Sequence, residues 1–305
     1  MPAVSVAAGC CPASTPANEV VEDIFGLVRI LSDGTVVRSP VGPVFCPTTF
    51  PGSHPSLEWK EAVYDKAKNL HVRMYKPTPT PTASVGKKKK LPVLVHFHGG
   101  GFCLGSCTWA NVHAFCLRLA AEAGAVVLSA GYRLAPEHRL PTAVDDGVGF
   151  LRWLSRLSAQ STMDAAADGW LTKAADFGRV FVTGDSAGAT IAHHLAVRAG
   201  VAVAADDAGE AGEQDQDQVT IRGYVLLLPF FGGVERTASE QAECPAGAGA
   251  GSLLSLDVLD RFWRVSLPAG ATRDHPVANP FGPDSPELGS VDFGRRSLWW
   301  SVAST

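Results

Sequence analysis

Two short segments carry the residue types that acyl transfer through a serine requires. Residues 98–101 read His-Gly-Gly-Gly, and residues 184–188 read Gly-Asp-Ser-Ala-Gly. Ser186 in the second segment can act as a nucleophile toward a carbonyl carbon. The glycines of the first segment can bring backbone N–H groups close to the negative oxygen that forms during such an attack. The pair of segments therefore predicts a site for acyl-transfer chemistry.

The second segment lies between a strand pattern at residues 180–183 and a helix pattern at residues 187–199. A sharp strand-to-helix turn at this point lifts the hydroxyl of Ser186 above the edge of a sheet. Gly184 and Gly188 suit such a turn because larger side chains would collide with the neighbouring strand and helix. The same five-residue pattern arises by chance in glycine-rich chains, but its place at a strand–helix junction favours the catalytic interpretation.

Backbone amides are the candidate oxyanion donors. A short apolar run at residues 92–97 leads directly into the first glycine segment. We count Gly99, Gly100, Gly101 and Ala187 as the oxyanion hole, because glycines let a backbone approach a bound carbonyl closely and Ala187 begins a helix whose dipole favours negative charge. A simple glycine-rich turn is the alternative interpretation of the first segment. The side chain of Asp185 is expected to point away from the hydroxyl of Ser186 and to support the motif.

The elements that must position these residues alternate between short apolar runs and amphipathic helices. Strand patterns occur at residues 24–30, 35–38, 70–75, 92–97, 125–129, 180–183 and 224–228. Helix patterns occur at residues 111–123, 141–157, 187–199 and 256–265, with Gly124 and Gly200 as expected helix ends. Residues 32–34 (Ser-Asp-Gly) are expected to form a hairpin turn. This order predicts a mostly parallel central sheet with helices on both faces.

The chain is expected to form one large α/β domain. Residues 1–22 read as a flexible tail, residues 23–292 as the domain, and residues 293–305 as a second tail. Loops are expected at residues 77–90, 202–218 and 246–252, which are rich in Pro, Lys, small or acidic residues. With 305 residues of which 46% are hydrophobic, the chain has ample apolar surface for a core.

Composition excludes several classes of function. A net charge of −4 argues against a dedicated nucleic-acid binder, and the lysine run at residues 87–90 reads as a solvated loop. Seven irregularly spaced cysteines predict reduced thiols and no metal site. No signal peptide or membrane-spanning run is recognised, which favours the cytoplasm, with the nucleus as an alternative. The sequence does not indicate an oligomeric state.

Several separated segments match one family pattern. They are residues 98–105, 129–141 (SAGYRLAPEHRLP), 182–199 (VTGDSAGATIAHHLAVRA), 223–233 and 273–283. Through them, residues 20–292 resemble the plant carboxylesterase family, in the hormone-sensitive-lipase-like branch of α/β-hydrolases, which is related to the gibberellin receptors.

This resemblance implies hydrolysis of a small-molecule ester by Ser186, with Gly100, Gly101 and Ala187 as oxyanion donors and His98 holding the oxyanion loop. It also implies that the N-terminal segment and the region near residues 256–267 cover the pocket. Serine chemistry of this kind needs no metal and no organic cofactor.

Acyl transfer also needs a base that touches the serine hydroxyl and an acid that orients the base. In the family both follow the serine, but residues 293–305 contain neither Asp nor His. The resemblance therefore implies that the last two strands and both catalytic loops are missing, that residues 224–228 form a sheet edge, and that hydrolysis is impaired.

No histidine replaces the base on sequence grounds. His193 and His194 lie roughly 10–12 Å along the helix from the serine at 1.5 Å per residue. His138 and His275 fall in family segments where a structural role is expected, as it is for Asp145 and Asp146, which lie in a further helix.

Two alternatives to an esterase remain. The chain can be a non-catalytic binding protein that resembles the gibberellin receptors, although Gly101 follows the esterase pattern where the receptors carry serine. It can also be a truncated product without a function of its own.

Overall fold

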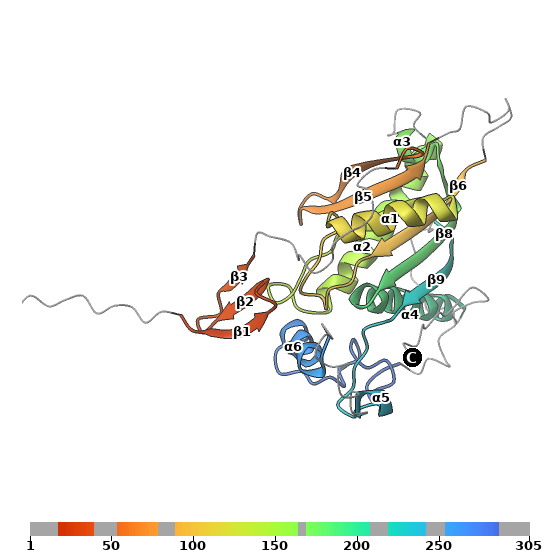
Figure 1. The fold of residues 1–305 in the computed structure, drawn as a ribbon. Helices are drawn as coiled ribbons and strands as arrows, with labels where there is room; N and C mark the ends of the chain where they lie inside the picture. The colour runs from red at the N-terminus through yellow and green to blue at the C-terminus, as the bar shows by residue number, and fades with distance from the viewer. Residues whose placement is uncertain are drawn as a thin grey trace, which may run out of the picture.

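A six-stranded sheet forms the centre of the molecule (Figure 1). The computed structural model describes residues 18–39, 54–78, 89–163, 169–207, 219–241 and 254–286. In the order β4-β5-β7-β6-β8-β9, the last four strands are parallel to one another and the first two are antiparallel to their neighbours. The strands are β4 (Leu57–Asp65), β5 (Leu70–Pro77), β6 (Leu91–Phe97), β7 (Val126–Ala130), β8 (Ala175–Asp185) and β9 (Ile221–Leu227).

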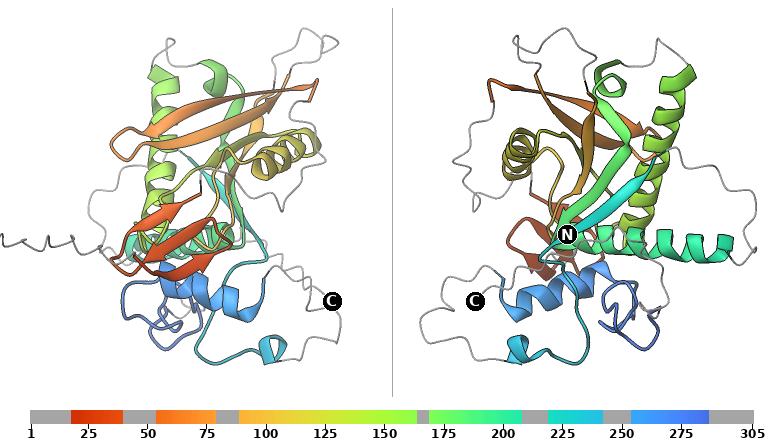
Figure 2. Two further views of the ribbon diagram at one scale, coloured as in Figure 1. Left: turned by 60° about the vertical axis from the view of Figure 1, so that its left-hand side comes forward. Right: turned by 90° about the vertical axis from the view of Figure 1, so that its right-hand side faces the viewer.

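Helices cover both faces of this sheet, as the alternating pattern predicts (Figure 2). On one face α1 contacts β5 and β7, and on the other α2 and α4 pack together, α4 against β6, β8 and β9. The helices are α1 (Ala110–Ala123), α2 (Thr142–Met163), α3 (Gly169–Thr172), α4 (Ala187–Asp207), α5 (Ala238–Gln241) and α6 (Leu256–Ser266). Gly124 ends α1 in the left-handed conformation, with φ of 56°, as expected for a helix end of this kind.

A separate antiparallel sheet of three strands lies beside α6 (Figure 1). It consists of β1 (Val20–Ile24), β2 (Val28–Leu31) and β3 (Val36–Arg38). The predicted turn at residues 32–34 joins β2 to β3. The expected single strand at residues 24–30 is instead broken by a turn, where Phe25 and Gly26 have φ of 56° and 66°.

Two further expectations need correction, and one strand was not predicted. The helix after the nucleophile does not end at Gly200 but continues to Asp207, because one glycine costs only about 1 kcal/mol within a helix of otherwise favourable residues. Residues 20–22, expected in the tail, belong to β1. Strand β4 was not anticipated, since its alternation is dominated by charged residues on an exposed edge. The remaining tails and loops, including residues 79–88, 208–218, 246–252 and 293–305, lie outside the described residues.

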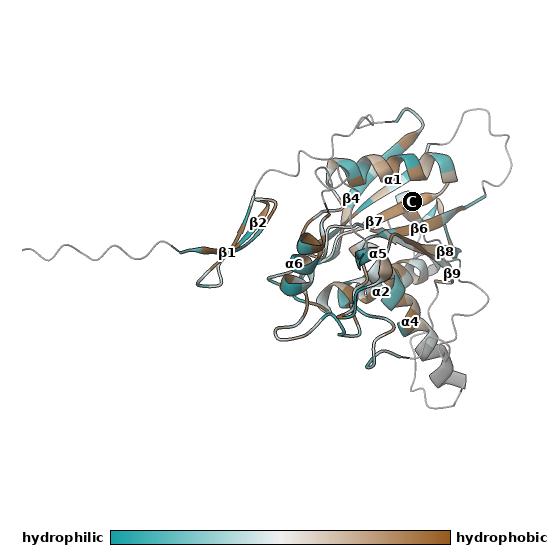
Figure 3. Cartoon of the chain, turned by 60° about the horizontal axis from the view of Figure 1, so that its bottom comes forward, coloured by the Kyte–Doolittle hydropathy of each residue, from teal (hydrophilic) through white to brown (hydrophobic). Residues whose placement is uncertain are grey.

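The core lies around the middle strands, where all five residues of β7 are buried. Figure 3 shows hydrophobic residues along β6 and β7, whereas the helices carry both hydrophobic and hydrophilic residues. Cys103, Cys107 and Cys116 are buried free thiols. Within the described ranges no helix is both long enough and apolar enough to cross a membrane. Strand β9 pairs with β8 alone among the described strands, so it forms the edge that the sequence predicts.

Candidate active site

Ser186 sits in the predicted turn, between the end of β8 and the start of α4. Its φ of 51° is a strained value for a residue with a side chain, and such strain persists only where the surroundings hold it. Backbone hydrogen bonds do so here. The amide of Ser186 donates to the carbonyl of Leu227 at 3.0 Å, and the amide of Phe230 donates to the carbonyl of Ser186 at 3.1 Å. The turn is therefore fixed by the end of β9.

The two glycines that flank the serine allow the close approach of backbone segments. A Cβ atom on Gly188 would overlap the carbonyl group of Phe97 at the end of β6, and one on Gly184 would overlap the carbonyl group of Gly188. At both positions the obstructing atoms belong to the backbone, not to the end of a flexible side chain that could move aside. This is the packing reason that the sequence suggested for glycine at both positions.

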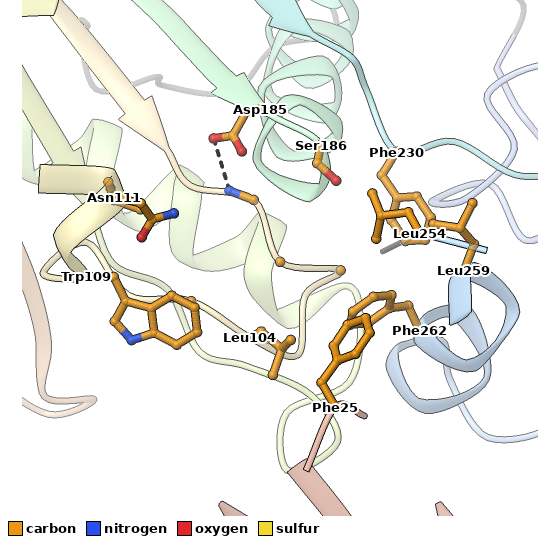
Figure 4. Close-up of a pocket in the computed structure, with 15 residues that line it drawn as sticks. Phe25, Leu104, Trp109, Asn111, Asp185, Ser186, Phe230, Leu254, Leu259 and Phe262 are labelled. Atoms are coloured by element: carbon orange, nitrogen blue, oxygen red, sulfur yellow. Dashed lines mark hydrogen bonds between the residues drawn. The ribbon is translucent and has the colours of Figure 1, made fainter. Parts of the chain in front are cut away.

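The glycine segment follows β6 and faces the same turn. Gly100 and Gly101 have φ of 121° and 59°, and neither backbone amide finds a hydrogen-bond acceptor among the described residues. The amide of Gly99, which was counted in the oxyanion hole, instead donates to Oδ1 of Asp185 at 3.1 Å (Figure 4). Gly99 is thus already paired and is not a free donor, which corrects that expectation.

His98 holds the glycine segment in place through contacts of its imidazole ring. Its ring stacks on Tyr132 at 4.5 Å between centroids, and its Nδ1 donates to the carbonyl of Gly99 at 2.8 Å. The hydroxyl of Tyr132 donates to the carbonyl of His98, also at 2.8 Å. Burial lowers the pKa of His98 to about 4, so the ring is neutral near pH 7. These contacts match the supporting role that the resemblance implies.

Asp185 connects the nucleophile turn to the glycine segment. Besides the amide of Gly99, its Oδ1 lies 3.4 Å from Nε2 of His96, a buried residue that sequence reasoning did not single out. Burial opposes ionisation of Asp185, but the hydrogen bond and charge of His96, with further help from His98 and Gly99, hold its pKa below the usual value. Residues of β6 alternate between the two faces of the sheet, and this alternation was the signal that could have placed His96 on the face next to Asp185.

A cavity of about 220 Å³ opens in front of Ser186. The turn after β1 contributes Phe25, and α6 contributes Leu259 and Phe262 (Figure 4). The N-terminal segment and α6 therefore border the pocket, as the resemblance implies. The full lining is Phe25, Gly99, Gly100, Gly101, Leu104, Gly105, Trp109, Asn111, Val112, Asp185, Ser186, Phe230, Leu254, Leu259 and Phe262.

No described residue supplies the base. All nine histidines of the chain fall within the described ranges, and none lines the cavity. Nε2 of His194 donates to the carbonyl of Val277 at 3.0 Å, and Nδ1 of His275 accepts from the amide of Val277 at 3.2 Å. His193 packs edge-on against Phe231, with ring centroids 5.1 Å apart. The expected structural roles of these histidines therefore agree with their contacts.

The carboxylates expected to fix structure both pair with arginines, Asp146 in the core and Asp145 at the surface. Asp146 is fully buried and accepts hydrogen bonds from the amide and the guanidinium of Arg133, the latter at 2.7 Å. Asp145 pairs with Arg198 at 2.9 Å. Among the described residues no group of three or more potential metal ligands is found.

Comparisons with known proteins agree with this geometry. A family profile described as alpha/beta hydrolase fold matches residues 94–292. The chain is 39% identical over 261 residues to probable carboxylesterase 6 of Arabidopsis thaliana, covering 86% of this chain and 69% of that protein. It is 36% identical over 240 residues to gibberellin receptor GID1B of the same plant, covering 75% and 58%.

Among solved structures, a hyperthermophilic esterase from Pyrobaculum calidifontis superposes with a TM-score of 0.50 at 28% identity, over 73% of this chain and 61% of that one. The strand-to-helix serine turn, the glycine segment and these sequence matches lead to one conclusion: the chain belongs to the plant carboxylesterase family of the α/β-hydrolase fold.

Proposed function

We propose that this chain is a carboxylic ester hydrolase in which Ser186 is the nucleophile. The observation that carries the proposal is the strained serine turn, which opens on a cavity beside the amides of Gly100 and Gly101, and neither amide has an acceptor in the described part of the chain. The amide of Ala187, at the start of α4, is the third donor in this proposal. The carboxylesterases among its relatives support the same activity.

The reaction has two steps. The hydroxyl oxygen of Ser186 gives up its proton and attacks the ester carbonyl, and the carbonyl oxygen becomes an oxyanion held by the amides. The acyl C–O bond then breaks, and the leaving oxygen takes up a proton and departs as the alcohol, which gives an acyl-serine. Water then attacks the acyl group and restores the serine. Both steps require a proton acceptor at the hydroxyl or the water, and the described residues bring no imidazole to the cavity. We therefore propose impaired turnover, above the roughly 10³–10⁴-fold enhancement over water that oxyanion stabilisation and binding provide without the serine, and far below that of a complete triad.

The experiment compares the protein with Ser186→Ala on 4-nitrophenyl acetate and butyrate. We expect slow ester cleavage above the Ser186→Ala level and an acetyl or butyryl adduct on the peptide that contains Ser186, detected by mass spectrometry. Gly149→Ala, a change in α2 with open space around the new methyl group, is the control for handling effects. Equal cleavage by both proteins, with no adduct on Ser186, would exclude it as the nucleophile.

A binding protein without catalysis is the second candidate, and the cavity without a base favours it. One contact argues against the receptor type in particular. A Cβ atom on Gly101 would overlap the ring of Phe262, so the serine that the receptors carry there is not accommodated beside this aromatic ring. Calorimetry with gibberellins distinguishes the two, because saturable heat with no acyl adduct on Ser186 would favour the binding protein.

A further inference from the structure

The cavity has two chemically different ends, with Ser186 and the glycine segment between them (Figure 4). One end is apolar, and its side chains come from the turn after β1, the segment after β9, the residues just before α6, and α6 itself. The other end lies at the start of α1, where Trp109 and Asn111 extend toward the cavity. The apolar end consists of Phe25, Phe230, Leu254, Leu259 and Phe262.

The apolar end is tightly packed. Phe262 is only 4% exposed, and its ring occupies the space that a side chain at Gly101 would need. Phe25 lies against it with ring centroids 6.3 Å apart, and Phe230 is stacked on Trp263 at 4.1 Å. Rings fixed in this way leave room only for a compact group. Because the rings offer no hydrogen-bond partner, that group should be apolar.

The end at α1 differs because it contains an available carboxamide. Asn111 is half-buried, and its side chain makes no hydrogen bond to any other residue that the structure describes. A carboxamide offers two N–H donors and one oxygen acceptor, so it pairs with water or with a bound group. The ring of Trp109 beside it is held in place by packing against both clusters of the core. This end therefore presents a rigid ring face and a carboxamide that bonds to none of the described residues.

The charge of the residues that line the cavity decides which polar group of a substrate can bind at this end. Asp185 also lines the cavity, and its lowered pKa keeps it ionised near pH 7. None of the described lining residues is a lysine or an arginine. A carboxylate or phosphate on the substrate would meet one negative charge and no positive one, which disfavours it. An uncharged hydroxyl or amide group meets no such penalty.

We propose that Asn111 is a specificity-determining residue, and that the substrate is an ester with a compact apolar group on one side of the carbonyl and an uncharged, hydroxyl-bearing group on the other. The apolar group lies among Phe25, Phe230 and Phe262, and a hydroxyl of the other group hydrogen bonds to the carboxamide of Asn111 over the ring of Trp109. This assignment rests on the proposed function, since it names the substrate class of the same pocket.

The test uses matched probes, glycerol monobutyrate and propyl butyrate, which share the butyryl group and differ by two hydroxyls. Their dissociation constants are measured by calorimetry with Ser186→Ala, in which no turnover through the serine occurs. We expect glycerol monobutyrate to bind about tenfold more tightly, as one well-formed hydrogen bond of about 1.4 kcal/mol predicts. In Ser186→Ala with Asn111→Leu, a change of similar size without hydrogen-bonding atoms, the ratio should fall to about one.

Phe25→Leu in the same background is the matched control at the apolar end. It should weaken the binding of both esters and leave their ratio near ten. Circular dichroism and the urea midpoint show whether each variant is folded, and Asn111→Asp provides a second substitution of equal shape if Asn111→Leu fails to fold. With Asn111→Asp the ratio should change, because the carboxylate keeps an acceptor but loses both donors. A ratio that is the same in every variant at position 111 would overturn the assignment.

The same proteins separate this inference from the proposed function. If the unsubstituted chain forms no acyl adduct while the binding ratio still depends on Asn111, hydrolysis by Ser186 is wrong and the polar subsite stands. If an adduct forms and the ratio does not respond to Asn111, the proposed function stands and the subsite is wrong.

Discussion

The two sheets of this molecule are held in place by different forces. The six-stranded sheet is built from parallel ladders with buried strands at its centre, and the serine turn and the glycine segment leave directly from the ends of β8 and β6. The three-stranded sheet meets the rest of the chain mainly through side chains. Arg38 at its end donates to the carbonyls of Cys103 and Ala135, both at 2.8 Å, and pairs with Glu137 at 2.6 Å.

At the other end of the small sheet, Glu22 pairs with Arg264 of α6 and Phe25 rests on Phe262. The turn that presents Ser186 is thus held by backbone hydrogen bonds and by the close packing of its glycines, whereas the walls of the pocket depend on a few charged and aromatic side chains. We infer that chemistry and specificity are separable here: the walls can change between relatives without disturbing the turn that presents Ser186.

The largest effect expected of a single substitution comes from filling the close contact between the serine turn and the central sheet. In Gly188→Ala the new Cβ atom overlaps the carbonyl of Phe97, so the helix or the strand must move. We expect a loss of roughly 3 kcal/mol in the free energy of unfolding, measured by urea denaturation. Gly149→Ala meets open space in α2 and should be neutral or slightly stabilising. Equal urea midpoints for the two variants would show that the turn is not tightly packed.

Acid should weaken the large sheet and not the small one. Burial lowers the pKa of both His98 and His193 to about 4, from an ordinary value of 6.5. Between pH 6.5 and pH 4 these two histidines therefore bind protons in the unfolded chain but not in the folded chain. The stabilisation is complete above pH 6.5 and is lost as the pH falls toward 4, by about 2 kcal/mol per histidine at pH 5.

The pH effect is measured as the urea midpoint between pH 7 and pH 5. His193→Gln removes one titrating group, so its midpoint should fall less steeply over that range. The small sheet contains no histidine, and hydrogen exchange of its amides should not follow the same titration. A slope that is unchanged in His193→Gln would contradict the assignment of this effect to buried imidazoles.

Removing one polar attachment of the small sheet should loosen that sheet alone. Arg38→Gln loses the charge that pairs with Glu137 and shortens the reach to the carbonyl of Cys103. Since this guanidinium is partly exposed, we expect a cost of roughly 1 kcal/mol. Hydrogen exchange should become several-fold faster at the amides of β1–β3, with little change in the urea midpoint. If the central strands exchange faster to the same degree, the two sheets do not behave as separate units.

The smallest effect is expected for an ion pair inside the small sheet. Arg29 and Asp23 meet at 2.9 Å with about half of each side chain exposed to solvent, at 51% and 40%. Arg29→Gln should change the free energy of unfolding by less than about 0.5 kcal/mol and leave the exchange of β1–β3 almost unchanged. It is the matched control for Arg38→Gln, because both changes remove one guanidinium from the same sheet.

The elements that the sequence predicted well are those whose pattern is local. The strand, turn and helix around Ser186 could be recognised because each has its own apolar periodicity and the turn demands glycine. Strand β4 was missed because an exposed edge strand rich in charge lacks that signal. The extension of α4 beyond Gly200 was missed because the helix propensity of the neighbouring residues outweighs a single unfavourable glycine.

By itself, the sequence determined the fold class, the nucleophile turn and the glycine segment, since these follow from spacing and from the steric freedom of glycine. Only the tertiary structure decided that the amide of Gly99 is already paired with Asp185, that His96 stands behind that carboxylate, and that Phe25 and Phe262 meet across the pocket. The physical reason is distance along the chain. Phe25 and Phe262 are brought together by folding, and no periodicity or motif in either segment indicates that the two residues become neighbours.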